Sequence, residues 1–135
     1  MSGQVITNGK SKKCFYALLA ILLVAVFFRF WQLDSIPPGL YPDEAINANQ
    51  SISEPGKIFY PENGGREGLF INLIYLSFSL FGISLWSLKF IPALIGVLTV
   101  LGLYLLAKEL LQTSNSQPQT PNYIALLSSF FLACF

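Results

Sequence analysis

The sequence predicts an all-α, polytopic membrane protein, and three features of its composition support this fold class. Of its 135 residues, 53% are hydrophobic and only 11% are charged, and the mean hydropathy is +0.57. A soluble domain usually carries about 25% charged residues, so this chain lacks the polar surface that a soluble globule needs. Its apolar residues gather in runs separated by polar stretches, which predicts transmembrane helices joined by loops.

The composition also excludes several classes of function. The chain contains no His, which excludes His-based catalysis and most zinc chemistry. Its net charge is +1 and it has no basic stripe, so no nucleic-acid partner is expected. The two cysteines, Cys14 and Cys134, lie in apolar surroundings at opposite ends of the sequence, and no disulfide framework is predicted.

The first predicted transmembrane helix covers residues 14–33. Residues 1–13 are polar and basic and contain no acid, so the positive-inside rule predicts a cytoplasmic N-terminus. Arg29 and Trp31 lie near the far end of the apolar run, where a long cationic stem and an indole ring suit the lipid headgroups. A cleaved signal peptide is the alternative, but the run is long and no small-residue cleavage site follows it.

Residues 34–68 are the polar part of the sequence, and we expect them to form an extracytoplasmic loop. Every acidic residue except Glu109 lies in this stretch. Asp43 follows Pro42 and precedes Ala and Ile at helical spacing, which is typical of a helix start. We therefore predict a short helix over residues 43–53 that lies on the outer membrane surface.

The apolar run at residues 69–82 is too short to cross a bilayer, and we predict an interfacial helix there. The alternative is that the run continues to residue 88 and spans. The next predicted transmembrane helix covers residues 89–107. Lys89 and Lys108 flank it, and each topology places one of these lysines inside, so the positive-inside rule separates the two only weakly.

Residues 108–122 are predicted to form a polar loop, and residues 123–135 to begin a further transmembrane helix. Thirteen residues cannot cross the hydrocarbon core, and terminal carbonyls inside it would lack partners. We therefore expect the chain to be the N-terminal part of a longer, multi-pass protein of the plasma membrane.

Two short motifs in the loop carry side chains suited to chemistry. Asp43 and Glu44 lie at a predicted helix start, and a carboxylate there can act as a general base on an acceptor hydroxyl or amine. Arg66 and Glu67 lie among glycines just before an apolar helix, where an Arg can hold a phosphate at headgroup level. The simpler alternative is that Asp43 only caps its helix and Arg66 only anchors the interface.

Several stretches together resemble a known family. They are L-D-S-I-P-P-G-L-Y-P-D-E-A at residues 33–45, G-R-E-G-L-F at residues 65–70, L-F-G at residues 80–82 and L-K-F-I-P-A-L-I-G-V-L-T-V at residues 88–100. Their order is similar to that in the N-terminal module of the GT-C membrane glycosyltransferases, in the family of protein O-mannosyltransferases and lipid A aminoarabinose transferases. Lys89 stands where these relatives usually have Arg.

The resemblance implies roles for the charged site residues. Asp43 would be the general base that deprotonates the acceptor, with Glu44 in a supporting role. Arg66 would contact the donor phosphate. Tyr41, by its residue type rather than by the resemblance, could line a sugar or lipid site, and the alternative is an aromatic residue of the membrane interface. Glu67 belongs to the same substrate-binding stretch, but with the glycine after it replaces a Pro-Pro pair of some relatives, which puts the local loop shape in doubt.

The resemblance also implies the partners. The donor would be a sugar on a polyprenyl or dolichyl phosphate, the acceptor a protein, a lipid or a glycan, and membrane lipid would surround the site. The sugar would be transferred with inversion. No cofactor is certain, although carboxylates leave a divalent metal possible. The alternative function is a non-catalytic multi-span protein, such as a transporter or an assembly subunit, whose outer loop only packs.

Overall fold

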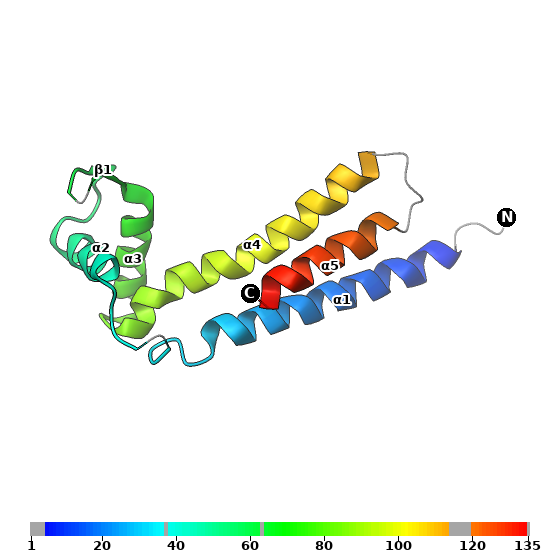
Figure 1. Cartoon of the computed structure of the whole chain (residues 1–135), viewed down its shortest axis with the longest axis horizontal. Helices are drawn as coiled ribbons and strands as arrows, with labels where there is room; N and C mark the ends of the chain where they lie inside the picture. The colour runs from blue at the N-terminus through cyan, green and yellow to red at the C-terminus, as the bar shows by residue number, and fades with distance from the viewer. Residues whose placement is uncertain (1–4, 37, 63, 114–119, 135) are drawn as a thin grey trace. The chain divides into compact units, whose positions relative to one another are not determined.

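The computed structural model describes residues 5–36, 38–62, 64–113 and 120–134, and most of them are helical (Figure 1). The predominance of helix agrees with the predicted fold class, and one small β-hairpin departs from it. The elements in order are α1 (Val5–Phe30), α2 (Pro42–Ser53), β1 (Phe59–Tyr60), β2 (Arg66–Glu67), α3 (Gly68–Phe81), α4 (Leu85–Thr113) and α5 (Thr120–Cys134).

The chain divides into two compact units. One consists of Met1–Trp31 with Leu94–Phe135, and the other of Gln32–Ala93. Helix α4 contributes its first residues to the second unit and the remainder to the first. We call them the helical unit and the loop unit, and each is described by itself.

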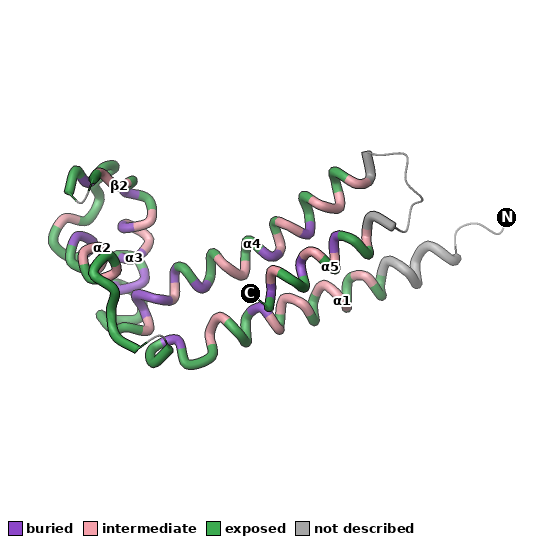
Figure 2. The backbone as a smooth tube through the Cα atoms, in the orientation of Figure 1, coloured by how far each residue is buried: buried purple, intermediate pink, exposed green. Residues whose placement is uncertain are grey.

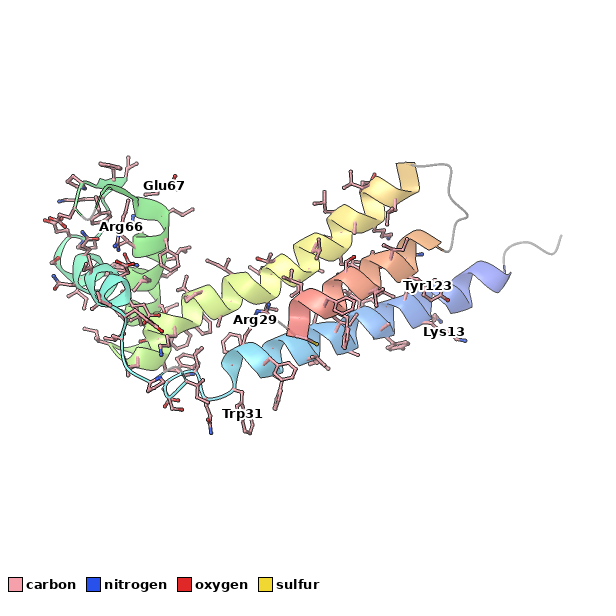
Figure 3. All side chains as sticks on the ribbon, viewed as in Figure 1. Lys13, Arg29, Trp31, Arg66, Glu67 and Tyr123 are labelled. Carbon is pink, nitrogen blue, oxygen red and sulfur yellow. The ribbon has the colours of Figure 1, made fainter. Side chains whose placement is uncertain are left out.

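In the helical unit, α1 and α5 lie side by side (Figure 1). Small or branched side chains are buried together here, namely Ala25 of α1, Ala133 of α5 and Val100 of α4. Small residues let helix backbones approach closely. Arg29 donates hydrogen bonds to the carbonyl oxygens of Leu132 (2.9 Å) and Ala133 (3.1 Å), and Figure 3 shows its side chain directed to that end of α5.

Two helical stretches are long and apolar enough to cross a membrane, Lys12–Phe30 with 19 residues and Leu85–Leu111 with 27 residues. Few of their side chains are buried, only 6% and 22% of the most apolar windows (Figure 2). Helix α1 begins well before the predicted boundary at residue 14 and ends before residue 33. Gln32 has a positive φ of 51°, which a regular helix cannot contain.

The loop unit is built around the contact between α2 and α3. Ile74, Phe78 and Leu88 form its buried apolar cluster, and Ala48 and Phe70 pack against it. Buried Ser77 of α3 donates a hydrogen bond to the Ser87 carbonyl of α4 (2.6 Å). The start of α4 also holds the loop before α2, because the ammonium of Lys89, only 5% exposed, donates to the Gly39 carbonyl (3.5 Å).

The structure separates α3 from α4, so residues 69–88 do not form one continuous helix. Gly82 follows α3 with a φ of 81°, a conformation that favours glycine. Ser84 and Ser87 then cap α4 reciprocally, each hydroxyl accepting the other's backbone N–H at 3.0 and 3.1 Å. Helix α3 has 14 residues, and at about 1.5 Å per residue it is shorter than the roughly 30 Å hydrocarbon core.

The ends of α4 and α5 also differ from the sequence-based boundaries. The serine cap starts α4 at Leu85, ahead of the predicted residue 89, and the helix continues to Thr113, into the predicted polar loop of residues 108–122. Lys, Glu, Leu and Gln at its end are good helix formers, so polarity there does not end the helix. Helix α5 begins at Thr120, ahead of the predicted residue 123.

Gly68 lies tightly against the backbone of the segment before β1, and its replacement by Ala tests the hairpin. A Cβ at Gly68 would clash with the Lys57 carbonyl oxygen and lie 2.7 Å from the Ile58 carbonyl oxygen, the atom that accepts the Gly68 N–H (2.7 Å). We expect Gly68→Ala to lower the free energy of unfolding by about 1–3 kcal/mol, the cost typical of overpacking. Thermal unfolding in detergent measures it.

The matched control is Gly102→Ala. A Cβ at Gly102, inside α4, would meet nothing within 4 Å, and Ala is a better helix former than Gly by about 0.5–1 kcal/mol. The control is expected to be neutral or stabilising. Equal stability of the two variants would contradict the close approach at Gly68.

Candidate functional site

The β-hairpin presents Arg66 and Glu67 from its second strand. Strands β1 and β2 are antiparallel, with Tyr60 opposite Arg66 and Phe59 opposite Glu67. Tyr60 is fully buried, and its hydroxyl donates to the Glu54 carbonyl (2.6 Å). The buried, hydrogen-bonded ring of Tyr60 fixes the position of β1, and β1 pairs with the strand that carries Arg66.

The amide of Asn72 fastens the segment before the hairpin to α3. Its Oδ1 accepts the Gly56 N–H (2.8 Å), and its Nδ2 donates to the Lys57 carbonyl (3.0 Å). The following strands are therefore held at the start of α3, where Figure 3 shows Arg66 and Glu67.

The first turn of α2 presents Asp43. Pro42 is the first residue of the helix, which suits its missing N–H and its fixed φ. Glu44 turns back and accepts the Tyr41 N–H (3.2 Å), so this carboxylate caps its own helix. Asp43 instead projects from the turn, with 77% of its side chain exposed.

Arg66 connects the hairpin to two successive turns of α2. Its Nη2 lies 3.1 Å from Asp43 Oδ1. Its Nη1 donates to the side-chain oxygen of Asn47 and, at 3.4 Å, to the Asp43 backbone carbonyl. Only 18% of the Arg66 side chain is exposed, so neighbouring residues cover most of its length.

A third polar residue extends this face of α2. Gln50 lies one turn beyond Asn47, is 3% exposed, and donates from its amide nitrogen to Glu62 in the hairpin segment. Asp43, Asn47 and Gln50 have the spacing of one helix face. The face of α2 that meets the hairpin is therefore polar, although the unit is rich in apolar side chains.

An open pocket of about 440 Å³ lies between α2, β2 and the start of α3. It is lined by Asp43, Asn47, Arg66, Glu67, Phe70 and Ile71. Charged and polar side chains make up part of this lining, and the aromatic ring of Phe70 and the aliphatic chain of Ile71, both from the apolar helix α3, make up the rest. An amphiphile with a polar head and an apolar tail matches this division of the lining.

The structure thus brings together three of the residues singled out in the sequence, namely Asp43, Arg66 and Glu67, although the first two are far apart in the chain. Glu44 and Tyr41 do not line the pocket. Glu44 caps α2, and Tyr41 is the exposed residue before that helix.

Sequence reasoning missed Asn47. The available signal was its spacing of one helical turn from Asp43, but polar residues at that spacing are also common on solvated helix faces. Its contact with Arg66 depends on the hairpin, which was not predicted.

A second ion pair of the loop unit joins Lys57 and Glu54. Lys57 donates to the Glu54 carboxylate, and this hydrogen bond raises the pKa of the Lys57 ammonium above its ordinary value. Among the residues that the structure describes, no group of three Cys, Asp or Glu side chains is arranged to hold a metal ion. The pocket itself offers two carboxylates, Asp43 and Glu67.

The arrangement combines a solvent-accessible carboxylate, a guanidinium and an apolar wall. The carboxylate can accept a proton, and a guanidinium can bind an anionic oxygen with parallel hydrogen bonds. Comparisons with known protein families, with curated proteins and with solved structures found no match to this chain.

The stabilities of variants at the two ends of the ion pair should differ. Asp43→Asn keeps the size of an exposed side chain, so we expect a loss of at most about 1 kcal/mol in the free energy of unfolding. Arg66→Ala leaves Asn47 without its donor and removes the link to the hairpin, and about 1–3 kcal/mol is expected. Thermal or denaturant unfolding in detergent measures both. A more damaging Asp43→Asn would show that the carboxylate mainly holds the fold.

Proposed function

We propose that the chain is part of a membrane glycosyltransferase that moves a sugar from a polyprenyl- or dolichyl-phosphate donor to an acceptor at the outer membrane face. The observation that carries the proposal is the pocket in which the Asp43 carboxylate and the Arg66 guanidinium meet at the start of the apolar helix α3. The resemblance of residues 33–45 and 65–70 to the GT-C transferases assigns these same two side chains to the reaction.

The lining of the pocket is compatible with such a donor. A lipid-linked sugar phosphate has an anionic head that suits Arg66 and an apolar tail that suits Phe70 and Ile71. Phosphate binding by Arg is favoured because two N–H groups can reach two oxygens at once. The acceptor, a protein, a lipid or a glycan, would approach from the exposed side of Asp43.

The reaction would be a single displacement with inversion at the anomeric carbon. The acceptor hydroxyl oxygen forms a bond to that carbon as the bond between the carbon and the phosphate oxygen breaks. The hydroxyl proton passes to the Asp43 carboxylate. The electron pair leaves with the polyprenyl phosphate, and Arg66 stabilises the negative charge that develops on it.

A non-catalytic multi-span protein is the second candidate, and one observation favours it. The guanidinium of Arg66 is bonded to Asp43 and Asn47, as it would be if these residues served only to hold α2 against the hairpin. The activity of variants at Asp43 separates the two candidates.

We further propose a multi-pass protein of the plasma membrane with a cytoplasmic N-terminus. The basic residues before the first apolar stretch support this orientation. The loop unit would then lie outside, with α3 at the interface, and α4 would return the chain to the cytoplasm. The shortness of α3 and its separation from α4 at Gly82 support this topology.

Asp43→Asn in the otherwise natural protein is expected to lower sugar transfer at least 100-fold, a loss typical of a missing general base. The measurement is the transfer of labelled sugar from a polyprenyl-phosphate donor, in membranes where the amount of protein is matched. Asp34→Asn is the control, because Asp34 is an exposed carboxylate of the same unit outside the pocket. Undiminished transfer by Asp43→Asn would refute the catalytic role and favour the second candidate.

Single-cysteine labelling tests the topology. With Cys14 and Cys134 replaced by Ser, we expect Ser53→Cys in intact cells to react with a membrane-impermeant maleimide, since it lies at the exposed end of α2. Lys108→Cys should react only after permeabilisation. Reaction of Lys108→Cys in intact cells would place that end of α4 outside and contradict the interfacial position of α3.

A further inference from the structure

Two side chains accept hydrogen bonds from Arg66, and one of them is charged whereas the other is neutral. Asp43 is a charged acceptor on the first turn of α2, exposed over 77% of its side chain, and it meets Nη2. Asn47 is a neutral acceptor one turn further on, half-buried, and it meets Nη1. Both belong to the lining of the pocket, as does Arg66 itself.

The ion pair between Arg66 and Asp43 opposes the binding of an anionic ligand. While Arg66 is neutralised by Asp43, its attraction for a phosphate is reduced, and the nearby carboxylate also repels the phosphate. A phosphate can take the place of Asp43 at Nη2, because that edge of the guanidinium faces the exposed side chain. The same exchange would release the Asp43 carboxylate as a base.

An arginine that lost its only partner would regain side-chain freedom and would have to be ordered again by the ligand. Asn47 reduces this cost, since its bond to Nη1 does not depend on the one at Nη2, and the longer bond from Nη1 to the Asp43 backbone carbonyl (3.4 Å) adds to its effect. Its neutrality is also important. A carboxylate at this position would make an equally good acceptor, but it would keep the guanidinium neutralised after Asp43 had left.

We propose that Asn47 is a positioning residue: it holds Arg66 in the pocket through a neutral hydrogen bond while a lipid-linked phosphate replaces Asp43 on the guanidinium. This inference rests on the proposed function and adds to it a residue and an order of events. Asp43 competes with the donor for Arg66, and Asn47 keeps Arg66 in place throughout.

The test uses Asn47→Asp, which keeps the shape and the acceptor but adds a charge. The purified full protein is titrated with undecaprenyl phosphate in lipid nanodiscs, and the dissociation constant is measured. We expect Asn47→Asp to weaken binding about tenfold, because one like charge near the ligand is worth about 1.4 kcal/mol at a partly exposed site. Asn47→Ala should weaken it less, since it leaves Arg66 charged but less ordered.

Two variants serve as controls. Asn49→Asp adds the same charge to an exposed position of the same helix outside the pocket, and its affinity should equal that of the wild type. Asp43→Asn removes the competing charge, so it should bind undecaprenyl phosphate more tightly than the wild type. If the unfolding temperature shows that Asn47→Asp does not fold, the comparison of Asp43→Asn with the wild type still tests whether Asp43 competes with the lipid phosphate for Arg66.

A purely structural role predicts a different pattern. An Asp at position 47 would then strengthen the link to Arg66, and lipid binding would be unchanged or improved. Such a result, or binding by Asp43→Asn no tighter than by the wild type, would overturn the inference. In transfer assays, Asn47→Asp should raise KM for the donor, whereas a smaller fraction of folded protein would lower kcat and leave KM unchanged.

Failure of the proposed function has its own signature. If the wild type binds undecaprenyl phosphate no better than it binds a neutral polyprenol, the site does not recognise a lipid phosphate, and the proposed function falls together with the role of Asn47. If the wild type binds and Asn47→Asp is unaffected, only the role of Asn47 is refuted. Excess inorganic phosphate that displaces the lipid would assign recognition to the headgroup rather than to the tail.

Discussion

The candidate site depends on the hydrogen bonds of the Arg66 guanidinium. These bonds join the second strand of the hairpin to two turns of α2 through Asp43 and Asn47, and Arg66 also lines the pocket. The hairpin in turn requires buried Tyr60 and the close approach of Gly68 to Ile58. Hydrogen bonds of a charged side chain are stronger where water is partly excluded. The bonds of Arg66 therefore stabilise the local fold, and they place its guanidinium where the proposed reaction needs it.

The lengths of α3 and α4 impose a second constraint. Helix α4 is long and apolar enough to cross a membrane, whereas α3 is too short to do so and is separated from α4 by Gly82. Because α3 contributes Phe70 and Ile71 to the pocket, the apolar wall of the site is continuous with an apolar helix. A lipid substrate held there would keep its tail beside apolar side chains and its head beside charged ones.

The sequence predicted the helices better than the site. Long apolar runs identify α1 and α4, and Pro42 with Asp43 identifies the start of α2, because these signals are local. The boundaries of α4 were misplaced, since its start depends on the reciprocal Ser84–Ser87 cap and its end on helix-forming polar residues. The hairpin was missed because its strands have two residues each, too few for a periodic pattern.

In the site, too, local signals were predictable from the sequence and contacts between distant residues were not. Asp43 and Arg66 could be selected by residue type and local context, but Asn47 acquires its role only when the hairpin folds onto α2. Glu44 was expected to support Asp43 in the site, and capping was considered for Asp43 only; in the structure it is Glu44 that caps the helix. The most direct test of the central claim is an experimental structure with polyprenyl phosphate bound. The phosphate is expected on Arg66, with the Asn47 bond kept and Asp43 detached; a phosphate bound elsewhere, beside an intact Asp43–Arg66 pair, would contradict it.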